Sequence, residues 1–263
     1  SKTKTFISGE NAKIIFDNCW LVGCKNLIGS VEDSDITFDS CTSEKIQAPI
    51  MTCHGANKIQ VVNSTMTADY APMAPVELGK YNMDALFCAN ADTISISKST
   101  FEGFIRGVVC GEEQIISVSD STFIECSAIV CGSNNHARVE SCIFKKCIHL
   151  FKNENITLLK CEFTECFGKI EATDIQCESC NWKDGFVHFE VPHYSSGKGS
   201  SRFSRCTFEN IHFQNSIEHL CHSNEHGYRY FSFMTDGEVD EVFSGINALI
   251  DAGHIGEISV CKF

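Results

Sequence analysis

Cysteines and histidines are the residues of this chain whose types and spacing could bind a metal. Cys177 and Cys180 form a C-x-x-C pair, and His188 and His193 follow Cys180 by 8 and 13 residues. A structural zinc site needs four ligands of these types, so this group could supply one. Cys180 also belongs to a column of serines and cysteines that recurs along the chain, which favours a buried structural role instead.

A denser run contains His219, Cys221, His222 and His226. Such a run could bind a metal or change its charge near neutral pH. It is also typical of a surface loop with incidental histidines, which is the more common origin. We therefore predict no metal and no cofactor, and the sequence alone leaves metal binding by this run open.

Patterns that carry catalysis are missing from the sequence. It contains no Walker-type phosphate loop, no G-x-G-x-x-G and no G-x-S-x-G element. Glycoside chemistry needs carboxylates that converge on one groove, and the chain has no such set of aspartates. The sequence thus predicts that the chain is not an enzyme and has no catalytic residues.

The composition restricts the partners. The 263 residues include 34 acidic and 21 basic ones, for a formal net charge of −13. This balance argues against nucleic acid and anionic membranes as partners, and no apolar run reaches the roughly 20 residues of a membrane span. The 17 cysteines are an odd number in a chain much longer than most disulfide scaffolds. We predict that most of them are reduced and buried.

A short repeat must position these residues. Its unit reads apolar-x-[Ser/Cys]-x-Phe-x-x-Cys, as in SDSTFIEC, and VVNSTM carries Met66 in place of the aromatic residue. The predicted aromatic anchors are Phe16, Phe38, Phe101, Phe123, Phe144, Phe163, Trp182 and Phe208. From Phe101 to Trp182 the successive steps are 22, 21, 19 and 19 residues. Like residues at a nearly fixed spacing predict ladders of stacked side chains.

Three further columns keep a fixed distance from the anchors. Two residues before an anchor lie Ser64, Ser99, Ser121, Cys142, Cys161, Cys180 and Cys206. Three residues after an anchor lie Cys19, Cys41, Cys126, Cys147 and Cys166. Thirteen residues before an anchor lie Cys88, Cys110 and Cys131. We predict that these residues have structural roles inside the fold.

A repeat of roughly 20 residues with alternating side chains predicts short strands joined by tight turns. Leucine-rich repeats share the length but would show periodic leucine, which is missing here. The sequence therefore predicts an all-β fold, a right-handed parallel β-helix (solenoid) of about ten rungs, each about 4.8 Å from the next. We expect one domain over residues 1–263, with a lateral loop at about 67–83. A less regular C-terminal region at about 191–263 is expected to supply a cap or trimer contacts.

The stretch from Phe101 to Cys147, with its GVVC and its C-x-F-x-x-C rhythm, resembles the large T-antigen-like early-region protein family of adenoviruses. A structural branch of relatives comprises the hexon-interlacing capsid proteins of atadenoviruses. That branch implies a homotrimeric β-helix that fastens neighbouring hexons on the capsid surface. The implied partner is the hexon capsid protein, and the implied locations are the virion and, during assembly, the host cell nucleus.

Two other functions stay open at this point. The regulatory branch of the same family is a protein-interaction scaffold that binds a host tumour suppressor and a ubiquitin-ligase partner. The end of this chain, GEISVCKF, lacks the Cys/His-rich signature of that branch, which favours the capsid protein. A tailspike-like, carbohydrate-active β-helix is the second alternative, because polysaccharide lyases and hydrolases share the fold.

Overall fold

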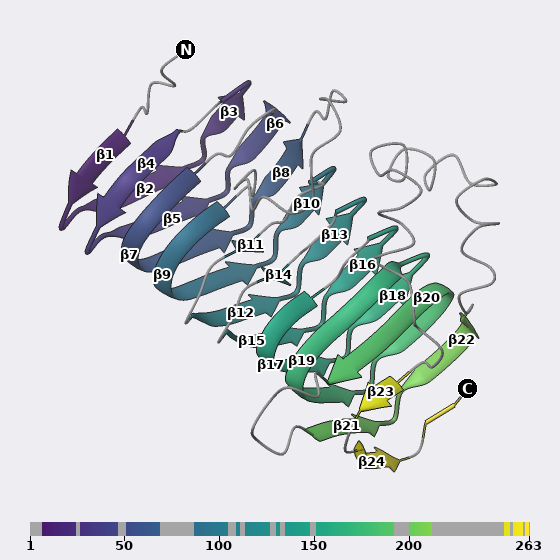
Figure 1. The fold of residues 1–263 in the computed structure, drawn as a ribbon. Coiled ribbons are helices and arrows are strands. Elements are labelled where there is room, and N and C mark those ends of the chain that lie inside the picture. The colour runs from purple at the N-terminus through teal and green to yellow at the C-terminus, as the bar shows by residue number, and fades with distance from the viewer. Residues whose placement is uncertain are drawn as a thin grey trace, which may run out of the picture.

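The computed structural model consists of parallel strands, each paired with the strand one turn further along the chain (Figure 1). The structure describes residues 7–24, 27–46, 51–68, 87–104, 109–110, 114–126, 130–131, 135–147, 151–191, 200–211, 250–252, 255–259 and 261–262. Within these ranges no residue lies in a helix. The prediction of an all-β parallel solenoid is confirmed.

The strands lie on three faces, which the chain visits in the order A, B, C before it starts the next turn. Face A comprises β1 (Ile7–Glu10), β4 (Ile28–Glu32), the first parts of β7 (Met51–Val62) and β9 (Phe87–Ser97), β11 (Val109–Cys110), β14 (Val130–Cys131), the first parts of β17 (Phe151–Leu159) and β19 (Phe167–Glu178), the second part of β20 (Asn181–Val191), and β23 (Ile250–Ala252).

Face B comprises β2 (Lys13–Asp17), β5 (Asp35–Asp39), the second parts of β7 and β9, β12 (Ile115–Ser119), β15 (His136–Glu140), the second parts of β17 and β19, β21 (Ser200–Ser204) and β24 (Ile255–Ser259). Face C comprises β3 (Trp20–Val22), β6 (Thr42–Ile46), β8 (Thr65–Ala68), β10 (Thr100–Glu102), β13 (Thr122–Ile124), β16 (Ile143–Lys145), β18 (Glu162–Thr164), the first part of β20, and β22 (Thr207–Ile211).

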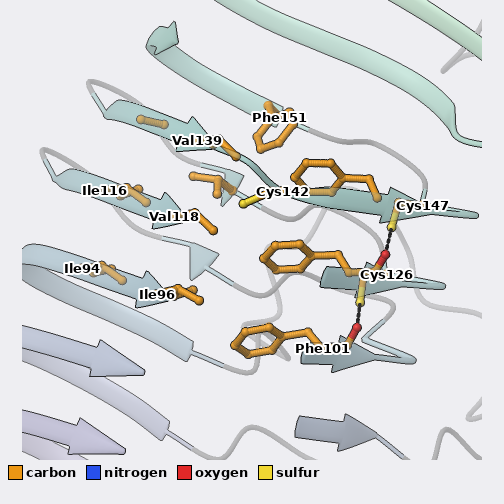
Figure 2. Packing of buried hydrophobic residues seen from close by; sticks show 14 of the residues in the cluster. Ile94, Ile96, Phe101, Ile116, Val118, Cys126, Val139, Cys142, Cys147 and Phe151 are labelled. Atoms are coloured by element: carbon orange, nitrogen blue, oxygen red, sulfur yellow. Dashed lines mark hydrogen bonds between the residues drawn. The ribbon is translucent and has the colours of Figure 1, made fainter. Parts of the chain in front are cut away.

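Alternating side chains explain why these segments form strands. In β12, Ile116 and Val118 point inward and are buried, whereas Ile115 and Ser117 point outward and are exposed. A strand that packs one face on a core has this period of two. The inward residues of successive turns form one continuous core, part of which Figure 2 shows.

The corner between faces B and C is made by one residue with a left-handed backbone. The φ values there run from 49° to 56°, a region that most L-residues avoid and that, apart from glycine, Asn and Asp tolerate best. These corner residues are Asn18, Ser40, Asn63, Lys98, Asp120, Ser141, Lys160, Ser179 and Arg205. A second corner follows face C, where Gly103 has a φ of 78° and a Cβ would lie 2.8 Å from the carbonyl oxygen of Ala68. Glycine is therefore required at that position.

Two regions that we expected to be irregular are partly regular. Thr67, where we expected the lateral loop to begin, lies in β8, and residues 69–83 of the expected loop lie outside the described residues. In the C-terminal region, β21 pairs with β19 and β24 pairs with β21 in the same parallel sense. The described parts of residues 191–263 therefore continue the solenoid.

Candidate functional site: stacked aromatic and thiol columns

Six aromatic rings stack along the inside of face C. Neighbouring ring centroids are 4.7–5.3 Å apart, and neighbouring ring planes differ by 3–10°. The six rings are Phe101, Phe123, Phe144, Phe163, Trp182 and Phe208. Each ring occupies the same position of its strand, so the register of the parallel ladder fixes the stack. Rings of this kind also contribute the largest apolar surfaces of a core.

The aromatic stack ends at Phe101 on its N-terminal side. Met66 pairs with Phe101 as predicted, but Ser43 and Leu21 occupy the same position in the two turns before it. The predicted anchors Phe16 and Phe38 lie instead on face B, where their rings stack on each other with centroids 4.8 Å apart. The placement of these two anchors was wrong, because Phe38 pairs with Val61 and not with Met66.

The column of serines and cysteines lies directly after the corner between faces B and C, and we call it the corner column. Its described members are Cys19, Cys41, Ser64, Ser99, Ser121, Cys142, Cys161, Cys180, Cys206 and Cys261. Each member donates a side-chain hydrogen bond to the carbonyl oxygen two residues before it. Cys19 and Cys41 thus belong here and not, as predicted, with Cys126.

Burial and neighbouring thiols shift the acidity of the corner column in both directions. Burial raises the pKa of Cys142 to about 12. Hydrogen bonds with Cys161 and Cys206 raise the pKa of Cys180. The same contacts lower the pKa of the partners, with that of Cys206 lowered to about 7 by its hydrogen bond with Cys180. The thiols therefore form an interacting chain along the solenoid axis.

A second thiol column, formed by Cys126, Cys147 and Cys166, follows face C. Each sulfur lies within hydrogen-bond distance of two carbonyl oxygens that its single S–H can share, that of the residue two before it and that of an aromatic residue one turn earlier. The acceptors are Phe101, Phe123 and Phe144, at 3.3–3.4 Å from the sulfur atoms. Figure 2 shows two of these bonds beside the stacked rings. Burial raises the pKa values of Cys126 and Cys147, so these thiols stay protonated.

Gly185 takes the next place in the second thiol column. A Cβ at this position would lie 2.2 Å from the carbonyl oxygen of Cys166, so no other residue fits without a backbone shift. The Cys110 and Cys131 backbones pair with each other on face A, and Cys110 also pairs with Cys88, as their common spacing predicts.

The residues considered for zinc do not converge where the structure describes them. Cys177 is buried on face B, Cys180 lies in the corner column, and His188 is buried on β20 opposite Lys169. Among the described residues, no group of three or more His, Cys, Asp or Glu side chains could hold a metal ion. His193, His219, Cys221, His222 and His226 lie outside the described residues.

Three large apolar side chains on the first turn are exposed, and we call them the first-turn patch. Ile15 on β2 is 53% exposed, and Trp20 and Val22 on β3 are 69% and 51% exposed. The inward neighbour of the latter two, Leu21, is buried. This patch was not predicted from the sequence. The run Trp20–Leu21–Val22, which places apolar residues on both the inward and the outward side of a strand, is the signal that could have revealed it.

No protein-family model matches the chain, and neither a curated protein nor a solved structure matches it. A search of the described residues for a helix long and apolar enough to cross a membrane also found none.

Proposed function

We propose that this chain is a structural protein, without catalytic activity, that fastens neighbouring hexons on the surface of an adenovirus particle. In this proposal it works as a homotrimer of right-handed β-helices of about ten rungs, and it is assembled with the particle in the host nucleus. Two things support the proposal. One is the resemblance of the stretch from Phe101 to Cys147, and the other is a core built from ladders of like residues.

The first-turn patch is the observation that carries the assembly role. Scattered exposed hydrophobic residues are normal on a monomer, but adjacent ones suggest contact with another protein. Ile15, Trp20 and Val22 lie on successive strands of one turn. Trp20 and Val22 are alternate residues of β3, so they share its outward side. Exposed apolar side chains that share one outward side suit the contact of one rod with another about a symmetry axis.

The chemistry of the cysteines fits assembly in a reducing compartment. All twelve cysteines whose side chains the structure describes are free thiols. Reduced and buried cysteines are typical of proteins made in the cytosol or nucleus rather than of secreted ones. This agrees with a particle that assembles inside the cell.

The trimer is tested with the double variant Trp20→Asp/Val22→Asp. Both side chains point outward, so we expect the fold to persist, and the variant should run as a monomer of 29.2 kDa while the unmodified protein runs as a trimer in light scattering. The matched control is Ile115→Asp, which alters a 62% exposed residue on β12, away from the patch, and should leave the trimer intact. If the unmodified protein is a monomer at micromolar concentration, the proposed trimer is wrong.

The capsid role is tested on purified virus particles. Immunogold electron microscopy with an antibody against this chain should label the outside of intact particles. Particles that lack the chain should lose integrity at a lower temperature than complete ones. Labelling of infected nuclei but never of purified particles, together with capture of a tumour suppressor and ubiquitin-ligase components, would favour the regulatory alternative instead.

A further inference from the structure

We propose that the outward side of β20, where face A begins, is a docking surface for another segment of the same chain, residues 212–249. The docking surface is formed by Phe186 and His188. We call residues 212–249 the insertion. This inference does not depend on the proposed capsid function, because it concerns how one chain packs on itself.

Phe186 and His188 point away from the core and are nevertheless buried. In β20 the side chains of Val187 and Phe189 belong to the continuous core, and the side chains of a strand alternate between its two sides. Phe186 and His188 therefore lie on the outward side. They are only 1% and 3% exposed, and Phe186 is buried without belonging to the continuous core.

A further layer therefore covers this part of face A. All the described strands belong to the wall of the solenoid itself, so the cover comes from another part of the chain. Phe167, which pairs with Phe186 and lies one turn earlier, is partly exposed. The cover is thus local to Phe186 and His188 and does not extend over the whole of face A.

Strand pairing identifies the part of the chain that lies next to the docking surface. Gly185 pairs with Ile211 in β22, and Phe189 pairs with Ile250 in β23 (Figure 1). Three residues of β20 separate Gly185 from Phe189, whereas the 38 residues of the insertion separate Ile211 from Ile250. The insertion therefore leaves the solenoid on one side of the docking surface and returns to it on the other.

Residues 192–199 are the other candidate for the cover, but they leave β20 at its far end. They follow Val191, and Phe186 lies five residues back, roughly 17 Å at about 3.3 Å per residue. Eight residues that reached Phe186 and returned to β21 would have to be almost fully extended. The insertion begins beside Phe186 and has no such limit.

The composition of the insertion suits a surface made of one aromatic and one imidazole side chain. Aromatic rings pack favourably edge to face or offset against one another, and they bury large apolar areas. The insertion offers six aromatic residues, which are Phe213, Tyr228, Tyr230, Phe231, Phe233 and Phe243.

The direct test places a photoreactive residue, p-benzoyl-phenylalanine, at position 186 of the full chain. On irradiation it should cross-link to a peptide from the insertion, which mass spectrometry identifies after digestion. The matched control carries the same photoreactive residue in place of Ile115, an exposed residue on β12, and should give no such link. Links from position 186 only to residues 192–199, or to no other part of the chain, would overturn the proposal.

Limited digestion with trypsin tests the same contact without a bulky probe. Arg229 is the only lysine or arginine of the insertion, so cleavage there reports its release. Phe186→Ser should speed this cleavage about tenfold, because a released segment opens more often. The solenoid should stay folded, since Phe186 lies outside the continuous core. Lys183→Ser, which alters an exposed residue of the same strand, should leave the rate unchanged. Equal rates in all three proteins would contradict docking at Phe186.

Discussion

After Cys41, the corner column has a run of serines (Ser64, Ser99 and Ser121, the serine half) followed by a run of cysteines from Cys142 onward (the cysteine half). The two halves support the same corner with different chemistry. In the serine half, each hydroxyl donates to the carbonyl two residues earlier at 2.7–2.8 Å. The same oxygen accepts a bond of 3.1–3.2 Å from the backbone amide of the column residue one turn before. A serine therefore joins two turns through a donor and an acceptor.

In the cysteine half, the sulfur atoms donate to backbone carbonyls and accept no hydrogen bond from a backbone amide among those that the structure shows. Cys161, Cys180 and Cys206 each donate to the carbonyl two residues earlier at 3.3–3.5 Å. They also lie 3.4–3.5 Å from a carbonyl of the preceding turn. Thiols are weak donors, so this half depends more on the volume and apolar surface of sulfur. The corner therefore needs a small inward side chain, and either hydrogen bonding or packing can hold that side chain in place.

The largest expected effect tests whether one aromatic stack runs beside both halves. Phe123 lies beside the serine half and Phe144 beside the cysteine half, with their ring centroids 5.1 Å apart. Phe123→Ala and Phe144→Ala should each lower the free energy of unfolding by roughly 3–5 kcal/mol, as buried aromatic truncations do. The exposed control Lys145→Ala should cost under about 0.5 kcal/mol. Urea unfolding measures the free energy of unfolding of all three variants. A small loss of stability on truncating either phenylalanine would contradict a continuous stack.

The second effect is the pH dependence of the cysteine half. The pKa of Cys142 is raised to about 12, so the folded protein keeps this proton when the unfolded chain has lost it. Stability from this thiol is complete below the ordinary pKa near 9 and is lost as the pH rises toward 12. Cys206, whose pKa is lowered to about 7 by its hydrogen bond with Cys180, acts in the opposite sense: its contribution is complete above the ordinary pKa near 9 and is lost as the pH falls toward 7.

We therefore expect the urea midpoint to fall steadily above pH 9, since burial also raises the pKa values of Cys126, Cys147 and Cys177. Cys142→Ser should make the fall shallower, because serine does not ionise in this range. A midpoint that stays constant up to pH 11 would contradict the reduced, buried state of these thiols.

A smaller effect comes from exchanging the two chemistries. Ser99→Cys adds volume to a packed position and weakens the acceptor for the amide of Ser64, so it should cost about 1–3 kcal/mol. Cys161→Ser leaves a slightly smaller side chain that keeps its bond to the carbonyl of Leu159, and it should cost about 1 kcal/mol. Thermal unfolding of both variants checks the order, and a larger cost for Cys161→Ser would reverse our view of the two halves.

The smallest effect tests the backbone of the other corner, which follows face C. Lys146 has a φ of 53°, a left-handed conformation that costs L-residues roughly 1–2 kcal/mol. Lys146→Gly should raise the free energy of unfolding by about 0.5–1 kcal/mol. Lys145→Gly, one residue earlier in β16, should instead lower it by a similar amount. Destabilisation by both changes would mean that the corner is not strained.

Sequence spacing predicted the stack from Phe101 to Trp182 because each ring there follows the corner column by two residues. It misplaced Phe16 and Phe38, since F-x-x-C also describes a phenylalanine on face B, three residues before the corner column. Spacing alone cannot separate these cases, because both put aromatic and thiol side chains inward. The polar corner residue just before each column member, such as Asn18, Ser40 and Asn63, is the signal that aligns all turns.

The first-turn patch lay beyond prediction for another reason. Trp20 would point inward if it occupied the anchor position of its strand, the position that Phe101 has in β10. In the structure Leu21 occupies that position, so Trp20 points outward. A slip of one residue would exchange the two faces of the strand. Only the pairing of Leu21 with Ser43 decides between these two registers.

The most direct test of the account is the state of the corner-column cysteines, read residue by residue with an alkylating reagent and mass spectrometry. Cys142, Cys161 and Cys180 should resist alkylation in the native protein and react fully once it is unfolded without reductant, when most of the 17 cysteines should count as thiols. Disulfide-linked peptides between these residues, or rapid labelling of all three in the native protein, would contradict it.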